Sequence, residues 1–142
     1  MTQPSEWLPT LESLRAAIAE DQLAKWINFS LDAVGENSVT AHMLVEKRLI
    51  APNGFLQGTF VVGFADITCG LGTASTLRDP NKSFATMELK SNFLGTATTT
   101  ERLVCLATAR HLGSRSQVWD AEVRREGADK TMALFRCTQM IF

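Results

Sequence analysis

The segment NGFLQGTFVVGFADIT, residues 53–68, is the most hydrophobic part of the chain, and its interpretation decides the fold. After Gln57 it is almost wholly apolar, yet it contains one acid, Asp66. The apolar run from Gly58 to about Thr73 is too long for a typical buried strand, so its length favours a buried helix. Its four glycines and its β-branched residues make it a weak helix in isolation. We therefore expect a central helix that depends on packing for its stability.

Sequence runs on both sides of this segment predict β-strands. FSLDAV (29–34) and SVTAHMLVE (38–46) flank a Gly-Glu-Asn turn. Four further runs follow the polar loop STLRDPNKS: they are FATMELKSNFL (84–94), ERLVCLATARHL (101–112), SQVWDAEVRRE (116–126) and KTMALFRCTQMIF (130–142). An antiparallel sheet with one helix laid across it is the simplest α+β arrangement of these parts.

Two finer features follow from periodicity. Residues 10–27 predict a single amphipathic helix with Thr10 as its N-cap, packed on the outside of the domain. In the run 84–94, regular alternation predicts that Thr86 shares a face with Glu88 and Lys90, opposite Leu89.

The overall composition is that of one ordinary globular domain. The chain has 142 residues, 45% hydrophobic and 20% charged, and a net charge of −1 without a local basic run, which argues against a nucleic-acid partner. The start MTQPSEWLPT lacks the features of a signal peptide. The apolar stretch 60–71 is interrupted by Asp66 and is too short to span a bilayer. We therefore expect a cytoplasmic protein without a membrane partner, whose cysteines (Cys69, Cys105 and Cys137) are free, buried thiols.

Asp66 admits two interpretations. A buried carboxylate is costly unless it is paired, hydrogen-bonded or neutralised, and no basic residue lies three or four positions away on the predicted helix. It can be a structural residue that binds a backbone group or a threonine. It can also be a functional acid, because carboxyl groups with perturbed pKa values cluster at functional sites.

The pattern around Asp66 resembles the active-site helix of hotdog-fold acyl-CoA thioesterases of the 4-hydroxybenzoyl-CoA and phenylacetate-pathway type. The resemblance rests on Gly54, the pair Gln57-Gly58, and an acid eight residues after Gly58, together with the order of the elements. It implies an antiparallel sheet wrapped around a central helix. The resemblance covers roughly residues 29–142, which would form the hotdog domain, and leaves residues 1–28 as an N-terminal helical extension.

The chain departs from the family pattern at three positions. That pattern is Asn or Gln, two residues, Gly, two residues, His-Gly-Gly, and an acid seven residues after the last Gly. Here Ala51, Gln57 and Thr59 replace the leading amide, the His and the second Gly. Asn53 could supply the missing amide if the loop is reshaped, and Gln57 can still donate a hydrogen bond as His does.

The resemblance implies roles for particular residues. Asp66 would act as general base or as nucleophile, and the backbone N–H of Gly58, at the start of the helix, would stabilise the oxyanion. Gln57 would assist in catalysis, and Thr86 would help to hold the water. Substrate contacts would come from Asn53, Thr59, Arg110, His111 and Arg115, the last three near the turn RHLGSRS and facing the CoA phosphates.

Helix geometry predicts that the site is shared between subunits. Gly58 and Asp66 are eight residues apart, about 12 Å along a helix. One acyl carbon cannot touch both in one chain, whereas two antiparallel helices about a twofold axis can bring Asp66 of one chain to Gly58 of the other. The expected assembly is a homodimer or a dimer of dimers, which is also how the family is built.

The leading function is acyl-CoA hydrolysis without a cofactor, with the CoA thioester as substrate. A non-catalytic protein that binds acyl thioesters is the first alternative, because of the departures at Ala51, Gln57 and Thr59. A hotdog dehydratase is the second, and it is disfavoured because no His lies near APNGFLQG. With two His in the chain, neither near a Cys or acid cluster, a metal site is not expected.

Overall fold

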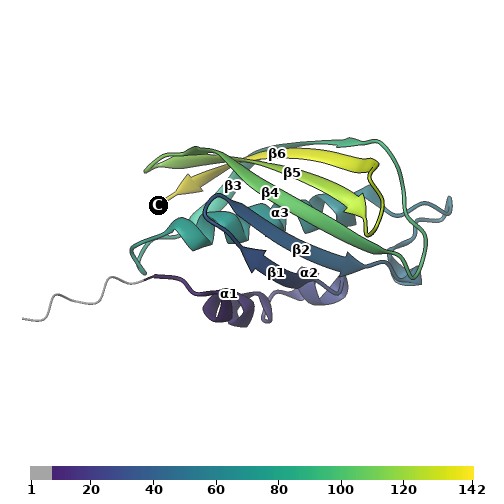
Figure 1. The fold of residues 1–142 in the computed structure, drawn as a ribbon, viewed down its shortest axis with the longest axis horizontal. Coiled ribbons are helices and arrows are strands. Elements are labelled where there is room, and N and C mark those ends of the chain that lie inside the picture. Colours follow the sequence, from purple (N-terminus) through teal and green to yellow (C-terminus); the bar gives the residue numbers. More distant parts are fainter. Residues whose placement is uncertain (1–7) are drawn as a thin grey trace, which may run out of the picture.

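The computed structural model describes residues 8–142 and shows one antiparallel sheet that wraps around a central helix (Figure 1). The helices are α1 (Leu11–Ile18), α2 (Gln22–Trp26) and α3 (Gly58–Thr76), with a 3-10 turn at Lys47–Leu49. The strands are β1 (Ser30–Val34), β2 (Ser38–Leu44), β3 (Phe84–Phe93), β4 (Arg102–Leu112), β5 (Ser116–Arg125) and β6 (Thr131–Ile141). Their order across the sheet is β1-β2-β4-β5-β6-β3, with every neighbouring pair antiparallel. The predicted α+β architecture is confirmed.

The core lies between α3 and the inner face of the sheet. Alternate residues of β2, β4, β5 and β6 are buried against the helix. The helix begins at Gly58 as predicted and continues to Thr76, three residues beyond the expected end. Cys69, Cys105 and Cys137 are free and buried in this core, as expected. None of the helices within residues 8–142 is both long and apolar enough to cross a bilayer.

The single helix predicted at residues 10–27 is wrong, because the segment forms two helices. Thr10 caps α1 in a capping box with Ser13, as expected for the N-cap. Asp21 then adopts an extended backbone, and its Oδ1 accepts the N–H of Ala24 at 2.8 Å, which starts α2. Asp favours N-cap positions over helix interiors because its side chain competes for backbone N–H groups. Residues 1–7 of the predicted 1–28 extension lie outside the described part of the chain.

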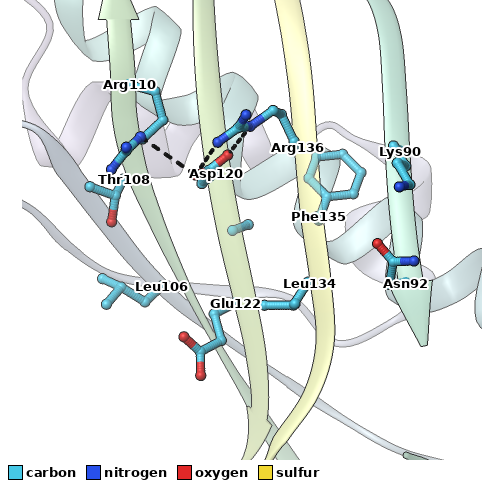
Figure 2. Close-up of a pocket in the computed structure, with 11 residues that line it drawn as sticks. Lys90, Asn92, Leu106, Thr108, Arg110, Asp120, Glu122, Leu134, Phe135 and Arg136 are labelled. Atoms are coloured by element: carbon cyan, nitrogen blue, oxygen red, sulfur yellow. Dashed lines mark hydrogen bonds and ion pairs between the residues drawn. The ribbon is translucent and has the colours of Figure 1, made fainter. Parts of the chain in front are cut away.

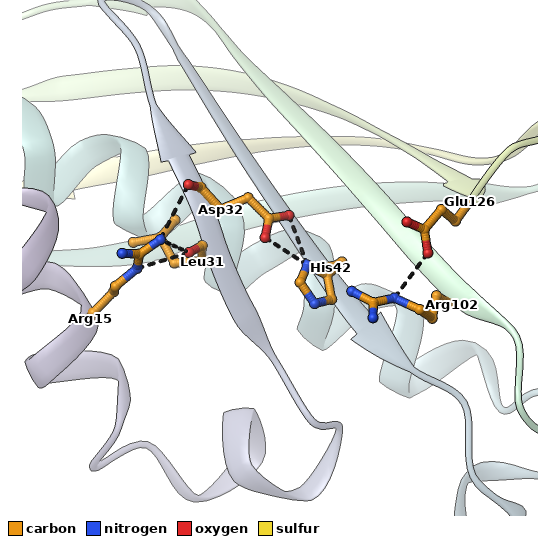
Figure 3. Close-up of polar contacts among 6 residues, drawn as sticks. All are labelled: Arg15, Leu31, Asp32, His42, Arg102 and Glu126. Atoms are coloured by element: carbon orange, nitrogen blue, oxygen red, sulfur yellow. Dashed lines mark hydrogen bonds and ion pairs between the residues drawn. The ribbon is translucent and has the colours of Figure 1, made fainter.

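The two short helices are fastened to the domain at several points. The Arg15 guanidinium donates to the carbonyl of Leu31 on β1 at 3.0 and 2.9 Å, and to that of Asp32 at 3.3 Å (Figure 3). Leu14 is buried in the core, and Leu23 of α2 packs on Gly63 of α3. On the other side of β1, the Asp32 carboxylate binds Nδ1 of His42 on β2 at 2.7 Å (Figure 3). The α1–α2 segment is therefore a fixed part of the fold.

Strand β3 contains a β-bulge that the sequence pattern did not predict. Thr86 pairs with Gln139 of β6 and Glu88 pairs with Thr138, so Met87 is the extra residue. The bulge shifts the alternation by one position, so Thr86 faces α3 while Glu88 lies on the outer face and binds Thr138 at 2.8 Å. The prediction that Thr86 and Glu88 share a face is wrong for this reason.

Two glycines of α3 offer a matched test of packing against this helix. A Cβ at Gly72 would lie 2.6 Å from the ring of Trp119, which is buried and held by a hydrogen bond to Gln117 at 2.9 Å. We expect Gly72→Ala to lower the free energy of unfolding by about 1–3 kcal/mol, since the indole cannot move aside. At Gly63 the nearest atom is also at 2.6 Å, but it belongs to the half-exposed, flexible side chain of Leu23. Gly63→Ala should therefore be neutral or stabilising in urea unfolding, because Ala favours helix. Equal losses in both variants would contradict this account.

Candidate active site

Asp66 lies on the face of α3 that meets the start of β3. The hydroxyl Oγ1 of Thr86 donates to Asp66 Oδ1 at 2.8 Å, so these two predicted residues are brought together. Burial raises the pKa of the Asp66 carboxyl above its usual value, and the hydrogen bond from Thr86 opposes this rise. No Lys or Arg hydrogen bond or ion pair to Asp66 is formed among residues 8–142. A half-buried carboxyl with a raised pKa and one hydroxyl partner suits a proton acceptor.

Gln139 completes a polar chain next to Asp66 and was missed in the sequence. It is fully buried on β6, and its Oε1 lies 3.2 Å from the Thr86 hydroxyl, while its Nε2 donates to Cys137 Sγ at 3.4 Å. A threonine hydroxyl has one proton, so it donates to Asp66 or to Gln139. When Asp66 is ionised, the proton points to Asp66. When Asp66 is protonated, it can donate to Thr86, which then donates to Gln139, so the chain serves both states of the acid.

A cavity of about 340 Å³ opens beside the Asp66 carboxylate. Its polar lining is Asp21, Asp66 and Thr86, and the rest is apolar or glycine. The apolar side chains come from three elements: Leu14, Ala17 and Ile18 from α1, Ile67, Leu71 and Ala74 from α3, and Phe84 from β3. A few polar groups in an otherwise apolar lining are typical of small-molecule sites.

Gly58 is the first residue of α3, eight residues before Asp66. Gln57 is the N-cap and makes no side-chain capping bond, and the N–H groups of Gly58 and Thr59 make no hydrogen bond within residues 8–142. Phe93 of β3 covers this glycine, with its ring 3.0 Å from the point where a Cβ would stand. Gly58 and Phe93 line a second cavity of about 520 Å³. Phe93 was not predicted as a site residue, because an apolar residue at a strand end gives no signal that it covers a glycine.

The structure does not bring Gly58 and Asp66 together within one chain. They line two different cavities, in keeping with the distance of about 12 Å along the helix. Gln57 and Thr59 are exposed beside Gly58. Asn53 lies in the preceding loop, where its Oδ1 accepts the N–H of Phe55 at 3.2 Å.

The predicted CoA-contacting residues lie elsewhere. Arg110 sits on the outer face of the sheet, where its Nε is 3.6 Å from Asp120, itself bound by Arg136 at 2.5 and 2.8 Å (Figure 2). The Arg136 guanidinium holds the pKa of the Asp120 carboxyl below its usual value. His111 and Arg115 are exposed at the β4–β5 hairpin. Arg110 is therefore separated from Asp66 of its own chain by the sheet.

Comparisons with known proteins show which family the chain belongs to. The pattern of the Thioesterase superfamily matches residues 53–131, more than half of the chain, and it includes Gly58, Asp66 and Thr86. PM0788 of Pasteurella multocida, a candidate esterase, is 30% identical over 129 residues, which are 91% of this chain and 90% of that protein. A 1,4-dihydroxy-2-naphthoyl-CoA hydrolase of Escherichia coli is 29% identical over 80% of this chain and 82% of its own length.

A solved structure shows the same architecture. A variant of thioesterase PA1618 from Pseudomonas aeruginosa superposes with a TM-score of 0.84, at 26% identity and over 94% of each chain. The family resemblance of the 53–68 segment is confirmed by these matches. The chain belongs to the thioesterase superfamily and is a thioester hydrolase with the hotdog fold.

Proposed function

We propose that this thioester hydrolase cleaves acyl-CoA at a site made by two copies of the chain, with Asp66 from one and the Gly58 N–H from the other. The observation that supports this proposal is that the two groups line different cavities of one chain. The proton acceptor, Asp66, lies beside one cavity, and the helix N-terminus at Gly58, which has no side-chain cap, lies in another. Neither half has both groups that thioester hydrolysis needs. An isologous dimer with antiparallel α3 helices supplies two complete sites.

The reaction follows from these positions. Asp66 takes a proton from a water molecule, whose oxygen attacks the thioester carbonyl carbon while Thr86 holds the carboxylate in place. The Gly58 N–H donates to the oxyanion, and the absence of a side chain lets the carbonyl come close. The C–S bond then breaks, and the thiolate of CoA takes the proton back from Asp66. In the alternative route, Asp66 attacks the carbonyl carbon directly, the C–S bond breaks to release the thiolate of CoA, and an anhydride forms; water then hydrolyses the anhydride, which restores the Asp66 carboxylate and supplies the proton that the thiolate takes up.

The other predicted residues keep their expected roles in the proposal. Gln57 is proposed to assist in catalysis and Thr59 to contact the substrate, because both are exposed next to Gly58, in reach of a molecule that enters at the helix N-terminus. Asn53 lies in the loop that leads into the helix, and Arg110, His111 and Arg115 are proposed to contact the CoA phosphates. The E. coli relative is a hydrolase of an aromatic acyl-CoA, so aromatic CoA thioesters are among the substrates to test first. We propose that the protein acts in the cytoplasm and uses no cofactor.

The test is a hydrolysis screen over short, medium, long and aromatic acyl-CoAs, read from release of the free thiol. Analytical sedimentation of the same sample gives the assembly state. Hydrolysis by a dimer or larger assembly supports the proposal, whereas a stable, active monomer at micromolar concentration would rule out the shared site.

Thr86→Ala tests the partner of the acid. The variant loses one hydrogen bond, worth on the order of 0.5–1.5 kcal/mol, so turnover should fall by up to about tenfold. That hydrogen bond opposes the rise in the pKa of Asp66, so its loss should raise this pKa further. Because a base works only when ionised, the acid limb of the pH–rate profile should move to higher pH.

Thr138→Ala is the matched control for Thr86→Ala. Its hydroxyl binds Glu88 on the outer face of the sheet at 2.8 Å, away from Asp66. The control should keep both the rate and the pH profile of the wild type. An unchanged pH profile in Thr86→Ala would reduce Thr86 to an ordinary strand residue.

A further inference from the structure

The cavity beside Asp66 has a wall that does not belong to the sheet and central helix. It is supplied by α1 and the α1–α2 junction, through Leu14, Ala17, Ile18 and Asp21. On the α3 side, Asp66, Gly70 and Ala74 follow at intervals of four residues and so share one helix face. Gly70 and Ala74 add little bulk to this face, so the cavity extends from the carboxylate along α3, and we call this part of it the channel. Its other lining residues include Ala17 and Ile18 of α1 and Phe84, whose ring lies 3.3 Å from the point where a Cβ at Gly70 would stand.

We propose that this channel holds the acyl group and that α1 decides which acyl groups the enzyme accepts. The inference rests on the proposed function, since it takes the reacting carbonyl to lie at Asp66. An acyl chain whose carbonyl is at Asp66 has the channel as its apolar continuation, and burial of apolar groups there favours binding. The cavity of about 340 Å³ is more than twice the roughly 150 Å³ that holds a benzene molecule, so a medium-length or aromatic acyl group fits.

The wall is rigid enough to select by size. Arg15 fixes α1 to the carbonyl of Leu31, and Leu14 is buried in the core. Ala17, by contrast, is small and exposed on α1 at the cavity. A larger side chain there would reduce the cavity without displacing a buried residue.

The wall also selects by charge. Asp21 and Asp66 both line the cavity, and its described lining contains no Lys, Arg or His. The Asp21 carboxylate is tied to α2, because its Oδ1 accepts the N–H of Ala24. An acyl chain that ends in a carboxylate would bring a negative charge into a cavity lined by two acidic residues and would lose its hydration, so such chains should be rejected.

The size prediction is tested with Ala17→Leu against Ala16→Leu. Both put the same side chain on the same helix, but only Ala17 lines the cavity. In pockets that select by size, one methylene changes kcat/KM by about 10- to 200-fold. We therefore expect Ala17→Leu to reduce the ratio of kcat/KM for the longest accepted acyl-CoA over that for acetyl-CoA by about tenfold or more. Ala16→Leu should keep the wild-type ratio. Ile18→Ala removes atoms from the same wall and enlarges the cavity, so it should increase the ratio.

The charge prediction is tested with Asp21→Asn. Asn is an equally good N-cap, so α2 should be retained. The variant should gain activity on glutaryl-CoA relative to butyryl-CoA, while the wild type strongly prefers butyryl-CoA.

Failure of this inference can be told apart from failure of the proposed function. If the wild type hydrolyses no acyl-CoA, or Asp66→Asn hydrolyses as fast as the wild type, the proposed function is wrong. The affinities of non-hydrolysable S-alkyl-CoA analogues for the same variants then decide the role of α1 independently. Identical chain-length profiles for Ala17→Leu, Ile18→Ala and the wild type, in hydrolysis or in binding, would overturn it.

Discussion

Replacement of Asp66 by Asn is expected to reduce hydrolysis by about 10²- to 10⁴-fold, the usual contribution of a general base. Asn has nearly the same size and keeps one acceptor for the Thr86 hydroxyl, but it can neither take a proton nor attack a carbonyl carbon. Assembly and binding of a non-hydrolysable acyl-CoA analogue should therefore be retained. The measurement is single-turnover hydrolysis together with sedimentation and binding of the analogue. A rate within a few-fold of the wild type would exclude Asp66 as base and as nucleophile.

The same variant should be as stable as the wild type or more stable at neutral pH. Burial raises the pKa of Asp66 in the folded state. The free energy of unfolding is therefore higher when Asp66 is protonated than when it is ionised. This extra stability is fully present below the pKa of Asp in the unfolded chain, about 3.9, and is lost as pH rises through the higher folded-state pKa. Asn does not ionise, so the Asp66→Asn variant does not lose this stability as pH rises. Urea unfolding at acidic and neutral pH should show the advantage of Asp66→Asn growing with pH.

Mixed dimers are expected to show activity that neither parent has. One chain carries Asp66→Asn and the other carries Gly58→Leu, whose side chain would collide with Phe93 and block the helix N-terminus. If each site takes one residue from each chain, both lesions fall in the same site and the other site is intact. The purified heterodimer should then recover about half of the wild-type activity, from two nearly inactive homodimers.

The matched control places both lesions in one chain and pairs it with a wild-type chain. In the shared-site arrangement each site then contains one lesion, so this heterodimer should be nearly inactive. If Asp66 and Gly58 worked within one chain, the first heterodimer would be nearly inactive and this control would keep about half of the wild-type activity. The pair of measurements therefore distinguishes the arrangements even if one variant assembles poorly.

Much of the fold could be predicted because its signals are local. The length of the apolar run from Gly58 gave the central helix, and alternation gave the strands. The resemblance implied that Thr86 belongs to the site, where it would help to hold the water, whereas alternation alone placed Thr86 on the wrong face. The reason is the bulge at Met87, which depends on pairing with β6 and leaves no mark in the sequence of β3.

Other parts of the site depend on tertiary contacts. Gln139 is a polar residue at an inward position of β6, after Ala133, Phe135 and Cys137, and this break in an apolar series was the available signal. Phe93 over Gly58 and Ala17 beside Asp66 gave no such signal, because the segments that meet there are far apart in the sequence. The break between α1 and α2 could have been found from Asp21, a residue that favours N-caps.

The two outer strands of the sheet differ in how they would respond to a stray extended peptide. At β1 the strand is only five residues long, its pairing is irregular after Leu31, and Arg15 occupies that residue's carbonyl. At β3 the strand has ten residues, pairs within residues 8–142 only with β6, and exposes Leu89 and Phe93. Long, apolar, unpaired strand edges are templates for aggregation. The β3 edge, and not the β1 edge, is therefore the side on which an isolated chain is open to the addition of another strand.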